Sequence, residues 1–222
     1  AQSPVPEVKD WQNPAVFEKN QTRPHARIIP FDTRDLALTL DPGKSPYLLS
    51  LNGSWKFMLA DHPGLVPEGF YLPAFDAGDW NDINVPSNWE MEGFGHPKFR
   101  NITMTIETKP PFVPGYHNPT GCYKRTFTLP GNWPGREVLL RFEGVKSAST
   151  VWINGKEAGY NEGGFEPAEY NITPLLQPGK NDISVMVLRY SDGAFLENQD
   201  MWRLSGIFRS VTLIAKPPVH LH

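Results

Sequence analysis

Residues 182–190, DISVMVLRY, decide the fold, because β-branched side chains return at every second position, at Ile183, Val185 and Val187. Such alternation is the pattern of a β-strand that buries one face. Outward from this stretch, short β-branched and aromatic runs recur between turn signals. We expect at least eight strands, drawn from 50–59, 84–89, 100–106, 122–129, 137–143, 149–153, 158–160, 166–171, 182–190 and 211–214.

Tight turns and short connections separate these segments. Asn154-Gly155 is the strongest hairpin signal in the chain. No segment has the period of an amphipathic helix, and we expect one helical turn within 173–179. The sequence therefore predicts an all-β protein, an antiparallel β-sandwich of the jelly-roll type.

Residues 1–45 are predicted to form an irregular N-terminal arm. The arm is rich in Pro, Asn, Arg and Asp, and it contains Trp11 and Phe17. These two aromatic side chains favour docking on the folded domain, whereas the alternative is a loosely held terminus. Residues 46–217 have no stretch with the composition of a linker, so we predict one domain there.

Composition and motif searches exclude several classes of function. A formal net charge of -3 over 222 residues gives no basis for binding nucleic acid or an anionic membrane. Cys122 is the only cysteine, so no internal disulfide is expected. The histidines lack zinc spacing, and the chain has neither a phosphate-binding glycine loop nor a Gly-x-Ser-x-Gly elbow. If Ala1 follows a cleaved signal peptide, the protein is periplasmic or secreted, and otherwise it is cytoplasmic.

The most distinctive candidate site lies within residues 197–209, ENQDMWRLSGIFR. Carboxylates and amides bind sugar hydroxyls, and an indole can cover the apolar face of a sugar ring. The alternative is a structural loop whose arginines pair with nearby acids. Asn101 is a second candidate, with a hydrogen bond to local backbone as its alternative role. No two acids are marked by the sequence as a catalytic pair.

A series of motifs runs along nearly the whole chain. They are DWQNP at 10–14, SLNGSWKF at 50–57, VPSNW at 85–89, NIT at 101–103, PPFVP at 110–114, NPTGCY at 118–123, SDG at 191–193 and QDMWRLSGIFR at 199–209. In this order they resemble the N-terminal sugar-binding domain of the glycoside hydrolase family 2 β-galactosidases, of the large lactose-hydrolysing type.

The resemblance implies a galactose-binding-domain-like jelly roll that packs against a downstream barrel domain of the same polypeptide. In the family both catalytic glutamates lie on that barrel, so no catalytic residue is expected in this chain, and the chain alone should be inactive. The whole enzyme would be a retaining β-galactosidase acting on terminal β-D-galactosides. Residues 218–222 would begin the linker to the barrel, and a homo-oligomer is implied for the full enzyme.

The resemblance also assigns substrate-binding roles. Asn101 matches an asparagine that hydrogen-bonds sugar hydroxyls. Asp200 matches an aspartate that contacts galactose and helps to hold a sodium ion at its 6-hydroxyl, while the other sodium ligands belong to the downstream part. We expect Trp202 to pack in the core, with sugar stacking as its second role.

Some family members also hold a magnesium ion on this domain. The matching positions are Asp10, Asn13, Val16 (through its carbonyl), Glu162 and Asp192, and oxygen ligands suit a hard cation. The chain departs from the family at Glu162, where an amide is usual, and the added charge alters affinity and metal preference. Surface acids that hold no ion are the alternative.

Two other functions stay open from the sequence. One is a free-standing carbohydrate-binding module on the same fold, which would need an exposed aromatic platform. The other is the same domain of a family 2 β-glucuronidase or β-mannosidase. The Asp200 motif favours a galactoside, since that aspartate suits a galactose 6-hydroxyl.

Overall fold

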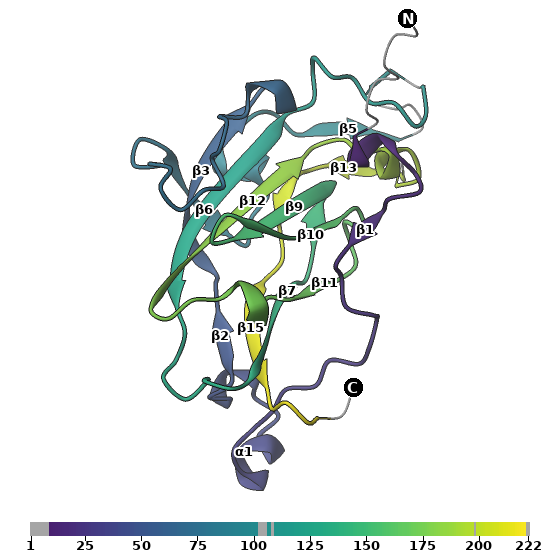
Figure 1. Ribbon diagram of the computed structural model, residues 1–222. Coiled ribbons are helices and arrows are strands. Elements are labelled where there is room, and N and C mark those ends of the chain that lie inside the picture. Colours follow the sequence, from purple (N-terminus) through teal and green to yellow (C-terminus); the bar gives the residue numbers. More distant parts are fainter. Residues whose placement is uncertain (1–8, 102–105, 108, 198, 221–222) are drawn as a thin grey trace, which may run out of the picture.

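The computed structural model describes residues 9–101, 106–107, 109–197 and 199–220, and in it two antiparallel sheets face each other (Figure 1). One sheet has seven strands, in the order β1-β10-β9-β12-β6-β3-β4, and the other has four, in the order β11-β7-β15-β2. Two further ribbons pair β13 with β5 and β14 with β8. The all-β sandwich expected from the sequence is confirmed.

The strands are short, as the spacing of the turn signals predicts. Their bounds are β1 Glu18–Lys19, β2 Leu48–Ser50, β3 Gly53–Ala60, β4 Asn81–Val85, β5 Lys98–Arg100, β6 Thr120–Thr128, β7 Glu137–Phe142, β8 Val145–Lys146, β9 Ala148–Ile153, β10 Lys156–Asn161, β11 Ala168–Asn171, β12 Lys180–Leu188, β13 Met201–Arg203, β14 Gly206–Ile207 and β15 Val211–Lys216. The α-helix α1 spans Arg34–Leu38. The 3-10 helices span Asp10–Gln12, Pro42–Lys44, Pro63–Leu65, Trp89–Glu92, Thr173–Leu175 and Asp192–Phe195.

Strand β12 lies in the middle of the larger sheet, between β9 and β6. Its alternating residues Ile183, Val185 and Val187 are fully buried in a core that both sheets share. Burying each of these side chains contributes roughly 1.5–3 kcal/mol. The alternation that predicted the strand thus corresponds to its core-facing side.

The turn between β9 and β10 is the predicted hairpin. Asn154 and Gly155 both have positive φ, 51° and 80°, as a two-residue type I′ turn requires. The Asn154 side chain also donates to the carbonyl of Leu175, at 2.9 Å. The hairpin is therefore tied to the predicted helical turn, which forms as the 3-10 helix Thr173–Leu175.

Residues 50–59 do not form the single strand that we expected. β2 belongs to the four-stranded sheet and β3 to the seven-stranded sheet, so the chain changes sheets at Asn52. The Asn52 side chain accepts from the amide of Val211 at 2.9 Å and donates to Ser210 Oγ at 3.1 Å. These bonds hold Asn52 against the start of β15, the strand with which β2 pairs. Trp55 and Phe57 are buried as predicted.

Two other predicted strands are shifted. The segment expected at 84–89 forms earlier, as β4, and then passes into the 3-10 helix Trp89–Glu92. The strand expected at 100–106 is β5, which ends at Arg100; residues 102–105 lie outside the described residues.

The N-terminal arm lies along one side of the sandwich. Its strand β1 pairs with β10, and the amide of Thr22 donates to the carbonyl of Glu169 at 2.8 Å. Gly159 of β10 permits this approach, since a Cβ there would lie 2.5 Å from the carbonyl oxygen of Lys19. The predicted boundaries at 45, 46 and 217 stay predictions.

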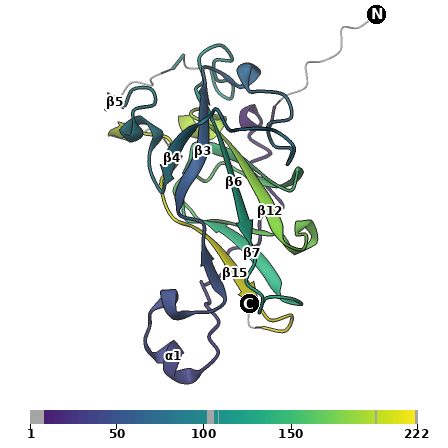
Figure 2. The ribbon, with the colours of Figure 1, turned by 90° about the vertical axis from the view of Figure 1, so that its left-hand side faces the viewer.

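The two ends of the sandwich differ. The loop with α1 projects from one end, whereas β5 and β13 lie at the other (Figures 1 and 2). Thr33 caps α1 by accepting from the amide of Leu36, and no residue of this helix is buried. In the described part of the chain, no helix has the length and apolar character needed to cross a membrane.

Candidate functional site

The ribbon of β5 and β13 brings the two predicted substrate residues together. Met201 pairs with Arg100 in this antiparallel ribbon, so one further step in register sets Asp200 opposite Asn101. Both residues are exposed and lie at the same end of the ribbon. Positions far apart in the sequence therefore form one polar pair at an end of the sandwich.

The outer face of this ribbon also carries two aromatic rings. Phe99 is 50% exposed and Trp202 is 58% exposed, and their ring centroids lie 5.5 Å apart. Side chains two positions apart on a strand share a face, so Trp202 lies on the side of Asp200, while Arg203 is buried beneath. The expectation that Trp202 packs in the core is wrong, because the register turns this residue outward.

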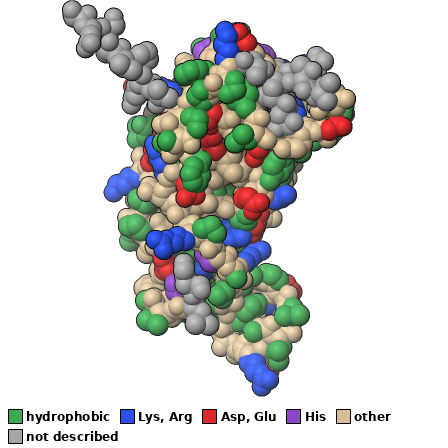
Figure 3. All heavy atoms as spheres, turned by 90° about the vertical axis from the view of Figure 1, so that its right-hand side faces the viewer, with side chains coloured by type: hydrophobic (Ala, Val, Ile, Leu, Met, Phe, Trp, Pro, Cys, Tyr) green, Lys and Arg blue, Asp and Glu red, His purple; other side chains and the backbone are tan. Residues whose placement is uncertain are grey.

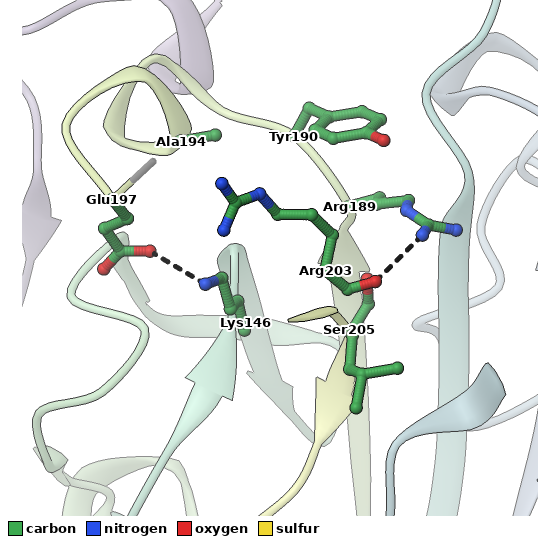
Figure 4. A pocket seen from close by; sticks show the side chains of 8 residues that line it. Lys146, Arg189, Tyr190, Ala194, Glu197, Arg203 and Ser205 are labelled. Carbon is green, nitrogen blue, oxygen red and sulfur yellow. Dashed lines mark hydrogen bonds and ion pairs between the residues drawn. The ribbon is translucent and has the colours of Figure 1, made fainter. Parts of the chain in front are cut away.

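Arg189 lies beneath the ribbon, directly after β12. Its Nη2 atom donates to the carbonyl of Arg203 at 3.0 Å (Figure 4). The same atom donates to the carbonyl of His96 at 3.1 Å. Its Nη1 atom lies 3.4 Å from Glu90 Oε1, and both side chains are almost completely buried. In the sequence, an arginine at the end of an apolar strand is the main sign of this pair.

Glu90 is the acid that balances Arg189. Its Oε2 atom accepts from the amide of Ser205 at 2.9 Å. Burial raises the pKa of the Glu90 carboxyl, and the Ser205 amide and the charge of Arg189 oppose this rise. The carboxyl thus connects the segment before β5 to the segment after β13.

A small cavity of about 20 Å³ lies next to Arg189, enough for roughly one water molecule. The Arg203 guanidinium points toward Lys146 and Glu197 at this cavity (Figure 4). Arg203 Nη2 also donates to the carbonyl of Gln199 at 2.7 Å. Lys146 Nζ lies 3.9 Å from Glu197 Oε2. Burial lowers the pKa of Lys146 and raises that of Glu197.

A second group of acids lies where the N-terminal arm meets the domain. Glu162 and Asp192 are both buried, and their two carboxyls interact with each other. The Tyr160 hydroxyl donates to Glu162 Oε1, and the amide of Gly193 donates to Glu162 Oε2 at 3.3 Å. Burial, followed by the contact with Asp192, raises the pKa of Glu162 to about 8. The Glu162 carboxyl is therefore mostly protonated at neutral pH.

The arm brings the other predicted magnesium ligands near this pair. The 3-10 helix Asp10–Gln12 contacts the 3-10 helix Asp192–Phe195, and Val16 packs near Tyr160. The Asp10 carboxylate instead pairs with Lys19 Nζ at 2.5 Å, and Asn13 Oδ1 accepts from the amide of Ala15.

The donor set fits a hard cation in part. Asp192 Oδ2 is buried and accepts no hydrogen bond from the described residues, which is the environment of an atom that a cation can satisfy. Across the described residues, however, no three His, Cys, Asp or Glu side chains are grouped to hold a metal. A cation here would therefore depend on the Asn13 amide and the Val16 carbonyl besides the two acids.

A larger pocket, of about 520 Å³, opens beside these acids. Its apolar walls come from the arm, from a proline pair and from the segment after Asp192: Pro14, Phe17, Pro110, Pro111, Phe195 and Leu196. On the face drawn in Figure 3, acidic and apolar side chains lie next to each other in the upper half. No local sequence pattern marks this pocket, since its walls come from segments far apart in the chain.

Curated relatives match almost the whole chain. The β-galactosidase of Priestia megaterium is 43% identical over 225 residues, which cover 99% of this chain and 22% of the relative. The β-galactosidase of Vibrio cholerae is 44% identical over 209 residues, which cover 94% of this chain and 20% of the relative. The chain thus spans about a fifth of the length of these relatives.

Solved structures show the same fold. A calcium-binding mutant of Bacteroides uniformis beta-glucuronidase 2 aligns with a TM-score of 0.61 and 26% identity, over 79% of this chain and 18% of that one. A beta-glycosidase from Bacteroides vulgatus aligns with a TM-score of 0.55 and 30% identity, over 77% of this chain and 20% of that one. The family model for the sugar binding domain of the family 2 glycosyl hydrolases matches residues 48–217. The chain therefore belongs to the family of sugar-binding domains of the family 2 glycosyl hydrolases.

Proposed function

We propose that the chain is the N-terminal sugar-binding domain of a retaining β-galactosidase that hydrolyses terminal β-D-galactosides. In this proposal Asn101 and Asp200 form one edge of the galactose subsite. The observation that supports it most is the register of β5 and β13, which sets these two residues opposite each other on an exposed face. The names of the relatives supply the substrate class.

The chemistry of the pair suits a pyranose ring. A carboxylate accepts hydrogen bonds from hydroxyls, and an amide both donates and accepts. The proposal leaves bond cleavage to two carboxyl groups on a downstream barrel of the same polypeptide, because retaining enzymes use an acid/base and a nucleophile flanking the bond. The role of this chain is then to bind and orient the sugar.

Two cations belong to the proposal. Asp200 would give one carboxylate oxygen to a sodium ion that also meets the sugar, while the barrel would supply the remaining ligands. A magnesium ion would be held by Asp192 and Glu162 with oxygen atoms of Asp10, Asn13 and Val16. It would tie the arm to the domain as a structural ion, and Glu162 must lose its proton to bind it.

A substrate panel with a matched pair of variants tests the main proposal. The intact polypeptide should cleave nitrophenyl β-galactoside in preference to the β-glucuronide and β-mannoside, and Asp200→Asn should lower kcat/KM for the galactoside at least tenfold. Asp35→Asn is the control, since Asp35 is an exposed acid on α1 at the opposite end of the sandwich. Preference for the glucuronide, or an unchanged kcat/KM in Asp200→Asn, would contradict the proposal.

One observation favours a second candidate, a domain that binds carbohydrate unaided. Phe99 and Trp202 form the exposed aromatic platform that such a module needs. The two candidates can be separated by titrating the 222-residue chain with galactose and lactose. Tryptophan fluorescence reports the binding. Submillimolar affinity that Trp202→Ala abolishes supports the module, whereas a subsite edge binds these sugars only weakly.

A further inference from the structure

We infer that Arg189, held by Glu90, is a positioning residue that sets the β5–β13 ribbon and with it the placement of Asn101 and Asp200. The inference rests on the proposed function and deepens it, since it names side chains that hold the galactose subsite without touching the sugar.

Backbone pairing does not fix the position of the β5–β13 ribbon on the sandwich. β5 and β13 pair only with each other and join neither large sheet through a backbone ladder, among the strands that the structure describes. The orientation of the ribbon relative to the sandwich therefore depends on side chains and on the segments that enter and leave it. A ribbon that is free to tilt would move Asn101 and Asp200 together.

Arg189 contacts both sides of the ribbon at its base. Its Nη2 atom donates to the carbonyl of His96, two residues before β5, and to the carbonyl of Arg203, the last residue of β13. Arg189 itself follows directly on β12, the central strand of the larger sheet. One planar guanidinium thus connects the rigid core to the two strands whose other ends carry Asn101 and Asp200.

Glu90 fixes the guanidinium and adds a third point of attachment. A buried arginine is tolerated when an acid pairs with it, and Glu90 Oε1 lies 3.4 Å from Arg189 Nη1. The other oxygen of Glu90 accepts from the amide of Ser205, and the carbonyl of Ser205 accepts from the amide of Trp89 at 3.1 Å. The segment that leaves β13 is therefore joined in both directions to the 3-10 helix Trp89–Glu92.

Arg203 extends this restraint toward the sugar-binding end. Its side chain reaches back along the ribbon and donates to the carbonyl of Gln199, next to Asp200. Arg189 thus holds the base of the ribbon through the carbonyl of Arg203, while the Arg203 side chain holds the loop before β13. The two arginines act in series on the position of the Asp200 carboxylate.

Arg189→Lys in the intact polypeptide is the decisive variant. Lysine keeps the charge opposite Glu90 but lacks the planar fork that serves two carbonyls and a carboxylate at once. We expect KM for nitrophenyl β-galactoside and the half-saturating sodium concentration to rise about tenfold, with a smaller change in kcat. A merely structural role would lower Tm without this split between KM and kcat.

Arg141→Lys is the matched control. Arg141 lies in β7 of the other sheet, is largely buried and is paired with Glu143 and Glu169 at 2.9 and 3.4 Å. Arg141→Lys should lower Tm about as much as Arg189→Lys does. It should leave KM and the dependence of activity on sodium unchanged. Equal effects of the two variants on KM would overturn the inference.

A double-mutant cycle with Asp200→Asn separates this inference from the proposed function. If Arg189 acts by placing Asp200, the effects of Arg189→Lys and Asp200→Asn on kcat/KM are less than additive. Additive effects would overturn the positioning role while leaving Asp200 as a sugar ligand. No effect of Asp200→Asn alone would contradict the proposed function instead.

Discussion

The β5–β13 ribbon and the acid pair at the N-terminal arm place their polar groups in opposite ways. On the ribbon, Asn101 and Asp200 are exposed at the end of a short ladder, beside two exposed aromatic rings. At the arm, Glu162 and Asp192 are buried beside each other, next to the pocket of about 520 Å³.

This difference shows what each region needs from outside. Exposed side chains at a ribbon end are largely surrounded by solvent, so changing them should alter binding and leave folding nearly unaffected. Buried acids are part of the packed structure, so changing them or their protonation should alter folding first. Each prediction below tests one side of this contrast, starting with the largest expected effect.

The first prediction concerns Asn101 and Asp200, the proposed sugar-binding pair. In the intact polypeptide, Asn101→Ala combined with Asp200→Ala should lower kcat/KM for nitrophenyl β-galactoside by about 100-fold or more, since a charged and a neutral hydrogen bond are lost. Thermal melting should shift by less than about 1 °C, because both side chains are exposed. Melting that falls by several degrees would show that the ribbon end is structural.

The second prediction concerns pH and the acid pair. The folded pKa of Glu162, about 8, lies above its ordinary value of 4.5, so the folded chain keeps a proton that the unfolded chain releases. The contribution of Glu162 to the unfolding free energy is therefore fully present below about pH 4.5 and is lost as the pH rises through 8. We expect this loss to amount to roughly 2 kcal/mol or more.

Glu162→Gln removes this titration and supplies the control. In metal-free buffer, the unfolding free energy of the variant should depend less steeply on pH between 5 and 8. Urea denaturation at each pH measures this free energy. Glu157→Gln, at an exposed position of the same strand β10, should keep the slope of the original chain. If the unfolding free energies of the original chain and of Glu162→Gln change with pH in the same way, Glu162 does not hold a proton in the folded chain.

The third prediction concerns magnesium. At pH 8.5, adding magnesium at ten times its dissociation constant should raise the unfolding free energy by about 1.4 kcal/mol, and EDTA should reverse the gain. Asp192→Asn should remove the response, because Asp192 supplies the buried oxygen that lacks a hydrogen bond. A response that survives Asp192→Asn would place the ion elsewhere.

The smallest effect is expected at the aromatic pair. Trp202→Ala should change the unfolding free energy by only about 0.5 kcal/mol, since the ring is mostly exposed and contacts Phe99 alone among the aromatic rings of the described residues. Trp55→Ala, in the core, should cost about 3–5 kcal/mol in the same urea titration. A large loss in Trp202→Ala would restore the core role that we first expected.

Local pattern was enough for much of the sandwich. Alternation identified β12, and Asn154-Gly155 identified the hairpin between β9 and β10, because both depend on neighbours along the chain. The change of sheet at Asn52 was not predictable in this way. It depends on hydrogen bonds to Ser210 and Val211, which no local window contains.

The site shows the same limit. Resemblance pointed to Asn101 and Asp200, but only the register of β5 and β13 shows that they are opposite each other. That register also turns Trp202 outward, against the usual burial of an indole. Arg189 and Glu90 were missed because their significance comes from three backbone segments that meet only in the folded chain.

The N-terminal arm has one more consequence, for association between chains. β1 covers the outer side of β10, and Gln21 forms a bridge with Tyr170 of β11, so the arm closes the neighbouring edges of both sheets. Uncovered strand edges are templates on which other strands add and aggregates grow. The edge that the arm leaves on the larger sheet is β1, which is two residues long, and so short an edge strand offers little backbone for another strand to pair with.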